Sequence, residues 1–344
     1  MTSENIVVTR KRLSQQQQSG ESHDGPRNDI GVIGQRLSAE YISSSDAGGS
    51  LIKRLIGNST EAQAALAAWQ VRKRARNYFS TGEDIALRLM PMLRVSGWGG
   101  RIYSVVHAAE GAKVRLLMKA LGHQQIGTFF TVSSSQKDFL VQTIGIPEEK
   151  VEFVYDSVDT EFFDPLQASP STGEGYIFAC GQENRDYKTL ARAAELGNWP
   201  VRVQASGYFE LTDDAVDATP ANFEVQRARI SYADLRDRYT GARLAVVPLH
   251  NVGYAAGVNG LLEAMAMGKA VVVTDSVGLL DYTGLNSLVK VPPGDHEKLR
   301  DALDALWNDP AACAEMGQEN RNWILSHARI EQYADTIVRH MLRS

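Results

Sequence analysis

The chain has 344 residues, of which 43% are hydrophobic and 22% charged, a composition typical of a globular protein with room for two domains. Its net charge of -5 gives no electrostatic reason to expect nucleic acid as a partner, since proteins that bind nucleic acid normally carry a basic footprint. No apolar run reaches the roughly 20 residues that span a bilayer, and the first residues carry no signal-peptide core. The two cysteines, Cys180 and Cys313, are too few for a disulfide framework. We therefore expect a cytoplasmic protein that binds no nucleic acid.

Short β-branched runs alternate with helical patterns along the chain. The runs predict strands over residues 5–9, 101–107, 127–132, 151–154, 176–180, 201–205, 242–248, 269–274 and 287–291. The helical patterns predict helices over residues 29–37, 134–143, 261–267, 295–308 and 330–343. A further helix is expected to open at Ser231, which Asp234 completes as a capping box. Pro310 is expected to stop the helix that precedes it.

Strands that are apolar throughout and alternate with helices predict parallel sheets covered on both faces. The pattern runs twice, and the best linker between the two passes is the segment 164–175, rich in Pro, Ser and Gly. We expect an α/β protein with two Rossmann-like doubly wound domains, 1–164 and 165–330, and a last helix, 331–344, that returns to the first domain. Two such domains would face a cleft at the carboxyl ends of their strands.

Three segments of the first domain can each be interpreted in two ways. The polar segment 12–29 fits either a mobile surface loop or a substrate loop over the cleft. The segments 69–79 and 111–122 combine basic and apolar residues. They fit either solvated helices with an apolar stripe toward the core or amphipathic helices that rest on an anionic membrane. The second interpretation would place the protein at the inner face of a membrane.

The segment "GVNGLLEAMAMG" (257–268) joins a glycine-containing turn to a short helix that Gly268 ends. Free N–H groups at the start of a helix attract phosphate, and glycine lets a backbone approach a ligand closely. Glu263 is expected in the first turn of this helix, where the helix dipole alone would stabilise an acid. These residues by themselves fit a phosphate site and an ordinary helix start equally well.

Five segments, taken in order, resemble the retaining glycosyltransferases of the GT-B fold, in their large family 4 group. They cover residues 132–165, 176–193, 230–249, 261–278 and 288–303. The resemblance implies that Glu263 binds the ribose hydroxyls of a nucleotide. It also implies a second acid eight positions earlier for the donor sugar, and this chain has Ala255 there. The backbone amides of the turn would hold the phosphates and the sugar; its residues are Ala256, Gly257, Val258, Asn259 and Gly260.

The resemblance also assigns cations to the leaving diphosphate, in a pattern that begins at Gly181. Gln182 stands where the family has an arginine, and Arg185 fits the position of the family's lysine, with Lys188 close by. A guanidinium offers two parallel hydrogen bonds to phosphate oxygens. A solvated Arg185 paired with Asp186 is the alternative. His107, after a strand of the first domain, would touch the donor sugar, although a lone His at a strand end is usually structural.

The base of the nucleotide would lie beside Arg229 and Ile230, which precede the helix that opens at Ser231. No Asp-x-Asp pair follows a strand, and no His/Cys set has zinc spacing, so we expect no metal and no cofactor besides the substrate. The segment "GWGG" (97–100) does not fit a dinucleotide fingerprint.

The resemblance implies metal-independent transfer of a sugar, with retention of configuration, from a UDP or GDP type of donor. The acceptor, whether a small molecule, a lipid or a glycan, is not identified by the sequence. Ala255 and Gln182 keep two alternatives open. One is a catalytically altered protein that binds nucleotide-sugars without transferring them, and the other is an epimerase or cyclitol transferase on the same fold.

Overall fold

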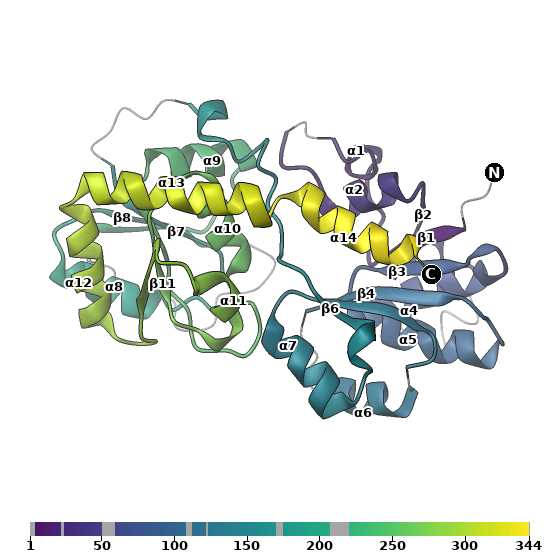
Figure 1. Ribbon diagram of the computed structural model, residues 1–344. Helices are drawn as coiled ribbons and strands as arrows, with labels where there is room; N and C mark the ends of the chain where they lie inside the picture. Colours follow the sequence, from purple (N-terminus) through teal and green to yellow (C-terminus); the bar gives the residue numbers. More distant parts are fainter. Residues whose placement is uncertain are drawn as a thin grey trace. The chain divides into compact units, whose positions relative to one another are not determined.

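The computed structural model describes residues 4–21, 24–49, 59–107, 112–121, 123–169, 175–206 and 220–343. The chain forms two compact units (Figure 1). Unit 1 comprises Met1–Glu21, Arg27–Tyr155 and Glu331–Ser344, and unit 2 comprises Ser22–Pro26 and Asp156–Ile330. The chain enters unit 2 after Tyr155, earlier than the expected boundary at 164. Residues 170–174 of the predicted linker lie outside the described residues.

Unit 1 is built on a six-stranded sheet with the order β2-β1-β3-β4-β5-β6, in which every neighbouring pair is parallel. The strands are β1 (Asn5–Thr9), β2 (Glu40–Ser43), β3 (Asn77–Ser80), β4 (Arg101–Val106), β5 (Ile126–Thr131) and β6 (Val151–Phe153). The sequence patterns predict neither β2 nor β3. The parallel, doubly wound sheet itself is confirmed.

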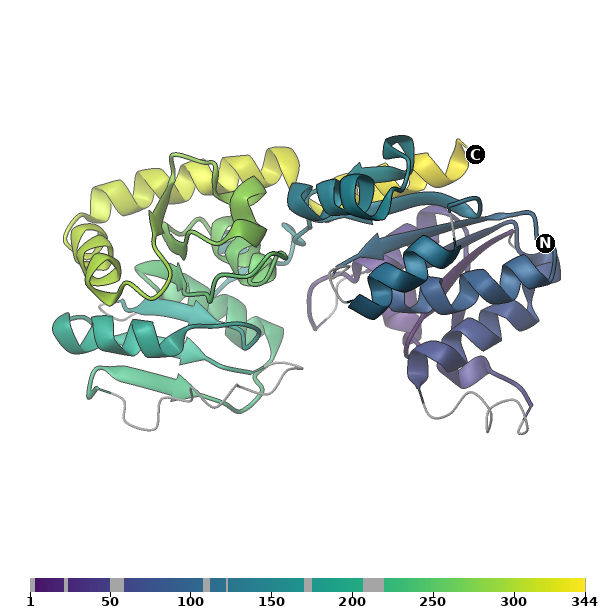
Figure 2. The ribbon, with the colours of Figure 1, turned by 90° about the horizontal axis from the view of Figure 1, so that it is seen from below.

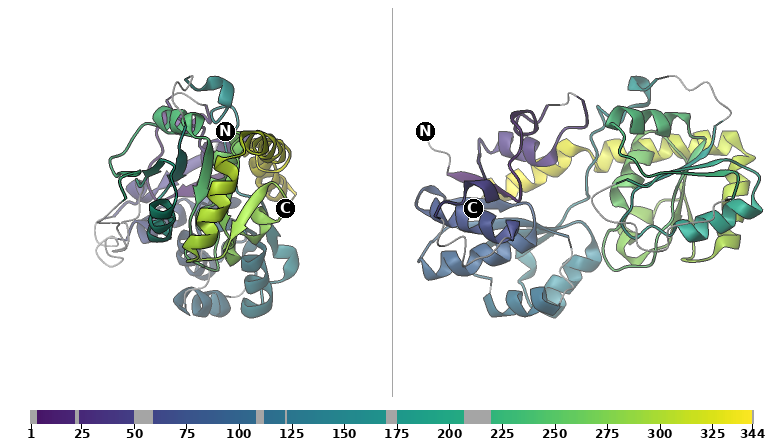
Figure 3. Two further views of the ribbon diagram at one scale, coloured as in Figure 1. Left: turned by 90° about the vertical axis from the view of Figure 1, so that its left-hand side faces the viewer. Right: turned by 180° about the vertical axis from the view of Figure 1, so that it is seen from behind.

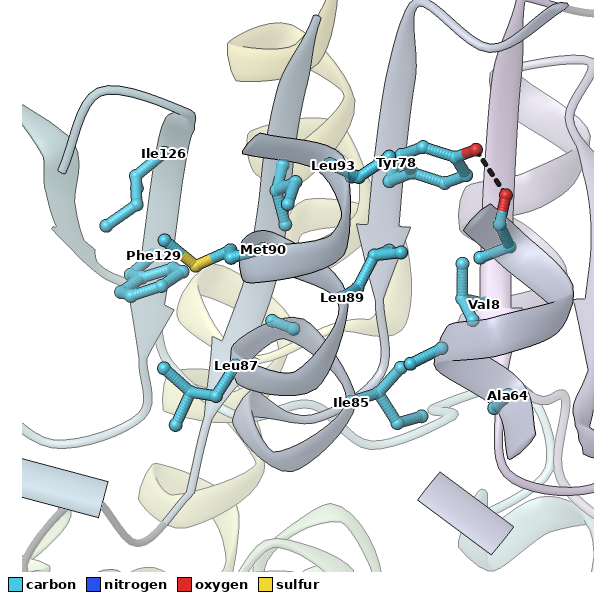
Figure 4. Packing of buried hydrophobic residues seen from close by; sticks show 14 of the residues in the cluster. Val8, Ala64, Tyr78, Ile85, Leu87, Leu89, Met90, Leu93, Ile126 and Phe129 are labelled. Carbon is cyan, nitrogen blue, oxygen red and sulfur yellow. Dashed lines mark hydrogen bonds between the residues drawn. The ribbon is translucent and has the colours of Figure 1, made fainter. Parts of the chain in front are cut away.

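Helices cover both faces of this sheet (Figure 2). They are α1 (Gln15–Gln18), α2 (Asp29–Arg36), α4 (Thr60–Gln70), α5 (Glu83–Val95), α6 (Ala112–Leu121), α7 (Ser134–Asp138) and α14 (Ile330–Leu342), with the short turns η1 (Ser44–Asp46), η2 (Arg72–Arg74), η3 (Phe139–Ile144) and η4 (Glu148–Lys150). Tyr78 of β3 reaches α4 and donates a 2.6 Å hydrogen bond to the carbonyl of Ala68 (Figure 4). Phe129 of β5 joins the same core, whereas Phe130 faces the other side and meets His340 of α14 edge-on, with ring centroids 5.5 Å apart.

Unit 2 repeats the plan with a six-stranded parallel sheet in the order β12-β11-β10-β7-β8-β9. The strands are β7 (Ile177–Cys180), β8 (Val201–Gln204), β9 (Phe223–Gln226), β10 (Leu244–Val247), β11 (Val271–Thr274) and β12 (Leu288–Val291). The order reverses between β7 and β10, since β8 and β9 lie on one side of β7 and β10 lies on the other. Such a reversal is where open α/β sheets bind ligands.

The helices of unit 2 also cover both faces of its sheet (Figure 3). They are α8 (Tyr187–Leu196), α9 (Tyr232–Gly241), α10 (Val258–Ala266), α11 (Leu280–Thr283), α12 (His296–Trp307) and α13 (Pro310–His327), with the short turns η5 (Pro165–Gln167) and η6 (Val277–Leu279). Leu190 of α8 and Leu303 of α12 pack with Val203 of β8 on one face. Phe178 of β7 points to the other face, where it meets Tyr239 of α9 edge-on at 4.9 Å.

Two helix predictions change in the structure, and one is confirmed. Pro310 does not only end a helix: it is the first residue of α13, where a missing N–H costs nothing, and Asp309 caps that helix. The helix predicted over 134–143 divides into α7 and the π-helical turn η3. The capping box of Ser231 and Asp234 is confirmed at the start of α9. In the polar segment 12–29, Gln15–Gln18 form one helical turn, while residues 22 and 23 lie outside the described residues.

Candidate functional site

Two loops of unit 2 meet at the reversal between β7 and β10. A bridge between Arg185 and Leu249 joins them, and the amide of Asp186 donates a 3.1 Å hydrogen bond to the carbonyl of Pro248. The amide of His250 donates in turn to the carbonyl of Asn184 at 3.0 Å. The loop after β7 is thereby held against the segment that leads into α10, so residues distant in sequence share one edge of the sheet.

Arg185 lies beneath the glycines of these two loops. Its side chain is 8% exposed, and it donates from Nε to the carbonyl of Cys180 at 2.9 Å and from Nη1 to the carbonyl of Glu183 at 3.0 Å. A Cβ on Gly257 would stand 2.9 Å from Nη1, and a Cβ on Gly181 would stand 2.5 Å from Nη2. Both positions therefore require glycine as long as the guanidinium stays in place.

The alternative of a solvated Arg185 paired with Asp186 is wrong. Asp186 caps α8, accepting hydrogen bonds from the amide of Thr189 at 2.9 Å and from its hydroxyl at 2.7 Å. Lys188, by contrast, lies exposed in the first turn of α8. The two cations proposed for the diphosphate thus differ in environment: one is buried below the glycine turn and the other is in solvent.

Helix α10 begins at Val258, three residues earlier than predicted, because Gly257 adopts a left-handed conformation with φ 85° and serves as its N-cap. Among the described residues, the amides of Asn259 and Gly260 donate no hydrogen bond. They are the orphan donors that a helix start leaves for a ligand. The early start moves Glu263 into the second turn, which corrects the prediction of a first-turn acid. The helix start therefore does not explain this acid.

Glu263 is the centre of a hydrogen-bonded cluster. Its Oε2 accepts a 3.0 Å hydrogen bond from the hydroxyl of Tyr239 and lies 3.8 Å from Sγ of Cys180. Burial raises the pKa of Glu263 to about 7, opposed by the hydrogen bond from Tyr239 and by the positive charge of Arg185. Burial and the neighbouring Glu263 charge raise the pKa of the Cys180 thiol to about 12, so this cysteine is a neutral donor and not a nucleophile.

At positions 182 and 255 the chain has Gln and Ala, not the residues that the resemblance implies. Gln182 donates from Nε2 to the carbonyl of Ala205 at 2.9 Å, while its buried Oε1 has no hydrogen-bond partner in the part of the chain that the structure describes. Ala255 follows Tyr254, whose hydroxyl donates to Oε1 of Glu183 at 3.0 Å. A carboxylate therefore lies in the loop after β7 although position 255 has none.

The predicted base contacts lie between β9 and α9, where Arg229 is exposed and Ile230 is half-buried. Gln204, at the end of β8, donates from Nε2 to the carbonyl of Ala228 at 2.9 Å. The side chain of Gln204 is 2% exposed, so it fixes this segment from inside the sheet edge.

His107 belongs to unit 1, where it is exposed at the end of β4. Its backbone is held from both sides, because its amide donates to Oε2 of Glu83 at 3.1 Å and its carbonyl accepts from Nε2 of Gln136. Glu83 is the first residue of α5, so its carboxylate lies at the N-terminus of a helix. Burial raises the pKa of Asp29, and the charge of His107 opposes that rise.

Sequence reasoning did not single out Tyr239, and it assigned no role in the site to Cys180. Tyr239 lies in a helix that the capping box at its start identifies, but no local pattern relates its hydroxyl to a glutamate in another helix. Cys180 directly precedes Gly181 at the end of an apolar strand, and that position at a strand terminus is the one signal the sequence offers. Among the described residues, no group of three or more His, Cys, Asp or Glu side chains could hold a metal ion.

Comparison with known proteins gives a family match for part of the chain and a fold for all of it. The family described as Glycosyl transferases group 1 matches residues 197–309, about a third of the chain. A glycosyltransferase from Rickettsia africae superposes with a TM-score of 0.71 at 13% identity, covering 100% of this chain and 99% of that one. Sucrose-phosphate synthase from Thermosynechococcus elongatus gives a TM-score of 0.72 at 13% identity, with 98% of each chain covered.

A third similar structure carries a ligand. Anabaena Alr3699/HepE in complex with UDP-glucose gives a TM-score of 0.71 at 11% identity and covers 99% of this chain and 100% of that one. These likenesses show that the chain has the GT-B fold. No curated protein matches the chain in sequence. Within the described residues, no helix combines the length and the apolarity needed to cross a membrane.

Proposed function

We propose that the protein is a retaining glycosyltransferase of the family 4 type, which transfers a sugar from a nucleoside-diphosphate sugar, of UDP or GDP type, to an acceptor. The observation that carries the proposal is the arrangement at the start of α10. The amides of Asn259 and Gly260 donate no hydrogen bond within the described part of the chain, Gly257 and Gly260 face the buried guanidinium of Arg185, and the Glu263 carboxylate follows one turn later. Amides and a guanidinium suit a diphosphate, and a carboxylate suits the hydroxyls of a ribose.

The proposed chemistry is substitution at the anomeric carbon. The bond from this carbon to the diphosphate oxygen breaks, the acceptor oxygen bonds to the carbon on the same face, and the acceptor proton passes to the leaving phosphate. The protein would contribute positioning and charge stabilisation. Arg185 and the amides of residues 256–260 would stabilise the charge that develops on the diphosphate, with Lys188 as a second cation. His107 would contact the sugar, and Arg229 and Ile230 would flank the base. No metal takes part in the proposed reaction.

The family match and the solved structures support the same proposal. The matched region, 197–309, contains Arg229, Ile230, Glu263 and the turn at 256–260. Alr3699/HepE binds UDP-glucose and has the same fold, and we extend a donor of that class to this chain. We place the enzyme in the cytoplasm, where both of its cysteines, which are free, would stay reduced. A lipid acceptor would suit helix α6, on which Leu116 is 72% exposed and flanked by exposed Arg115 and Lys119.

A ligand screen followed by a transfer assay tests the proposal. Thermal unfolding is measured with UDP, GDP, ADP, TDP and their common sugar conjugates. Ligand at about 100 times its dissociation constant adds about 2.7 kcal/mol of apparent stability. The selected donor is then incubated with acceptor mixtures, with and without EDTA, and the anomeric configuration of the product is read by NMR.

We expect one nucleotide to stabilise the protein, transfer to survive EDTA and the product to keep the donor's configuration. Binding without transfer to any acceptor would favour the nucleotide-sugar-binding alternative, which Ala255 and the neutral Gln182 support. Isomerisation of the donor without an acceptor would favour an epimerase. No response to any nucleotide would overturn the proposal.

A further inference from the structure

We infer that Tyr239 is a positioning residue that fixes the Glu263 carboxylate for the ribose of the donor nucleotide, an inference that rests on the proposed function. The two side chains come from different helices, α9 and α10, and meet on one face of the sheet of unit 2. Tyr239 contacts no ligand in this proposal. It acts only through the carboxylate that does.

The hydroxyl of Tyr239 takes part in three contacts. It donates to Oε2 of Glu263 at 3.0 Å, lies 3.2 Å from the carbonyl of Gly260, and is 2.8 Å from Sγ of Cys180. Since the hydroxyl has a single proton, it can donate to only one of these partners at a time and accept from the thiol. The shorter contact, to Oε2 of Glu263, is the donated hydrogen bond that the inference uses, and the carbonyl of Gly260 in the first turn of α10 lies within reach of the same proton.

The carboxylate is held on one side only. The described residues donate no hydrogen bond to Oε1 of Glu263, whereas Oε2 has Tyr239 and, more distantly, Cys180. A glutamate side chain otherwise loses its rotamer freedom when a ligand binds, which costs affinity. A carboxylate already fixed through Oε2 can present Oε1, and the remaining lone pair of Oε2, to two adjacent hydroxyls of a ribose.

Tyr239 is itself rigid. It is 1% exposed, its ring meets Phe178 edge-on at 4.9 Å, and it meets Phe163 edge-on with centroids 6.4 Å apart. The ring contacts do not involve the hydroxyl. Tyr239→Phe therefore keeps the packing of α9 on the sheet and removes only the contacts to Glu263, Gly260 and Cys180, which makes it a clean test.

The experiment measures dissociation constants for UDP and for 2′,3′-dideoxyuridine 5′-diphosphate, which lacks the ribose hydroxyls, by calorimetry at several pH values. The proteins are the wild type, Tyr239→Phe, Glu263→Gln, the double variant and Tyr176→Phe. Tyr176 is the matched control, since its buried hydroxyl donates to the carbonyl of Arg238 at 2.8 Å, outside this cluster. Melting temperatures are recorded for all five proteins.

We expect the wild type to prefer UDP over the dideoxy analogue and Tyr239→Phe to lose at least fivefold of that preference, with the analogue's affinity unchanged. In the wild type the hydrogen bond from Tyr239 lowers the pKa of Glu263. Its removal in Tyr239→Phe should raise that pKa, and the pH at which UDP affinity is half-maximal should rise with it. The groups that face this carboxylate are Tyr239, Cys180 and Arg185. Tyr176→Phe should behave as the wild type, and Tyr239→Phe should add nothing to Glu263→Gln.

An unchanged preference in Tyr239→Phe would overturn the inference and leave the proposed function intact. An equal loss for both ligands would do the same, because it marks a merely structural role. If the wild type binds UDP and its analogue equally, Glu263 does not bind the ribose hydroxyls, and the positioning role of Tyr239 is excluded as well. A wild type that binds none of the nucleotides of the screen would overturn the proposed function itself. If Tyr239→Phe does not fold, an effect of Cys180→Ala on the same preference supports the cluster, and its absence counts against it.

Discussion

Glu263 has a pKa raised to about 7, so its charge changes within the physiological range. Below pH 7 it is mostly protonated, and above pH 7 it is mostly ionised. An ionised carboxylate accepts stronger hydrogen bonds from ribose hydroxyls than a neutral one does, by about 1 kcal/mol. We expect affinity for UDP to rise about fivefold as the pH rises through 7, measured by calorimetry between pH 5.5 and 8.5.

The control for this pH dependence is Glu263→Gln, which keeps the shape of the side chain and removes its titration. Its curve contains only the titration of the ligand's own phosphates, and the difference from the wild type isolates Glu263. Glu195→Gln, at an exposed position on α8, should follow the wild type. Superimposable curves for the wild type and Glu263→Gln would contradict the assignment.

Arg185 and Lys188 can be separated by the same kind of measurement. Arg185→Lys should weaken binding of UDP and of inorganic pyrophosphate at least tenfold. The guanidinium of Arg185 donates to two carbonyls and at the same time faces Gly257 and Gly260, and an ammonium group cannot make all of these contacts. Lys188→Ala, at an exposed site, should cost less than threefold. A larger effect of Lys188→Ala than of Arg185→Lys would move the diphosphate role to Lys188.

At the scale of elements, the start of α10 depends on one glycine. Gly257 has φ 85°, and a Cβ there would stand 2.9 Å from both Arg185 and Leu249. Gly257→Ala should therefore carry the left-handed cost of about 1–2 kcal/mol and also displace Arg185, with a loss of UDP binding. Gly294→Ala is the matched control, with φ 74° and no atom within 4 Å. This control should lower the free energy of unfolding in urea and leave UDP affinity unchanged. Equal UDP affinity in Gly257→Ala and Gly294→Ala would contradict a role of the Gly257 turn in nucleotide binding.

Much of the element pattern could be predicted from the sequence, and the exceptions have physical causes. Long apolar runs identified strands such as β1, whereas β3, "NYFS", is too short and too polar at its ends for a pattern to register. Helix α10 starts earlier than predicted because Gly257, its N-cap, adopts a left-handed backbone conformation. Glycine permits this conformation, but the presence of a glycine does not predict it. Arg185, the glycine turn and Glu263 were predicted as one site, and they follow the adjacent strands β7 and β10. Tyr239 could not be, because its role arises from packing between helices.

At the scale of the whole molecule, the two doubly wound sheets could be predicted, but the passage between the units could not. Composition favoured the Pro- and Ser-rich segment, yet the chain enters unit 2 at Asp156, whose amide donates a 2.9 Å hydrogen bond to the hydroxyl of Tyr282. Val158 then forms a bridge with Arg329. Such contacts with residues more than a hundred positions away leave no local signal, so a boundary placed by composition falls too late.

The last helix, α14, offers a test of whether the two units respond separately. Ile337 is 0% exposed and belongs to unit 1, so Ile337→Ala should cost about 2–5 kcal/mol there. In hydrogen exchange read by mass spectrometry, peptides of β4 and β5 should exchange faster while those of β7 and β10 do not change. Saturating UDP should do the reverse and slow exchange only around residues 181–186 and 254–260. Leu342→Ala, at a 63% exposed site, should change neither set. Faster exchange in both units of Ile337→Ala would show that they open together, and α14 would then stabilise the molecule as a whole.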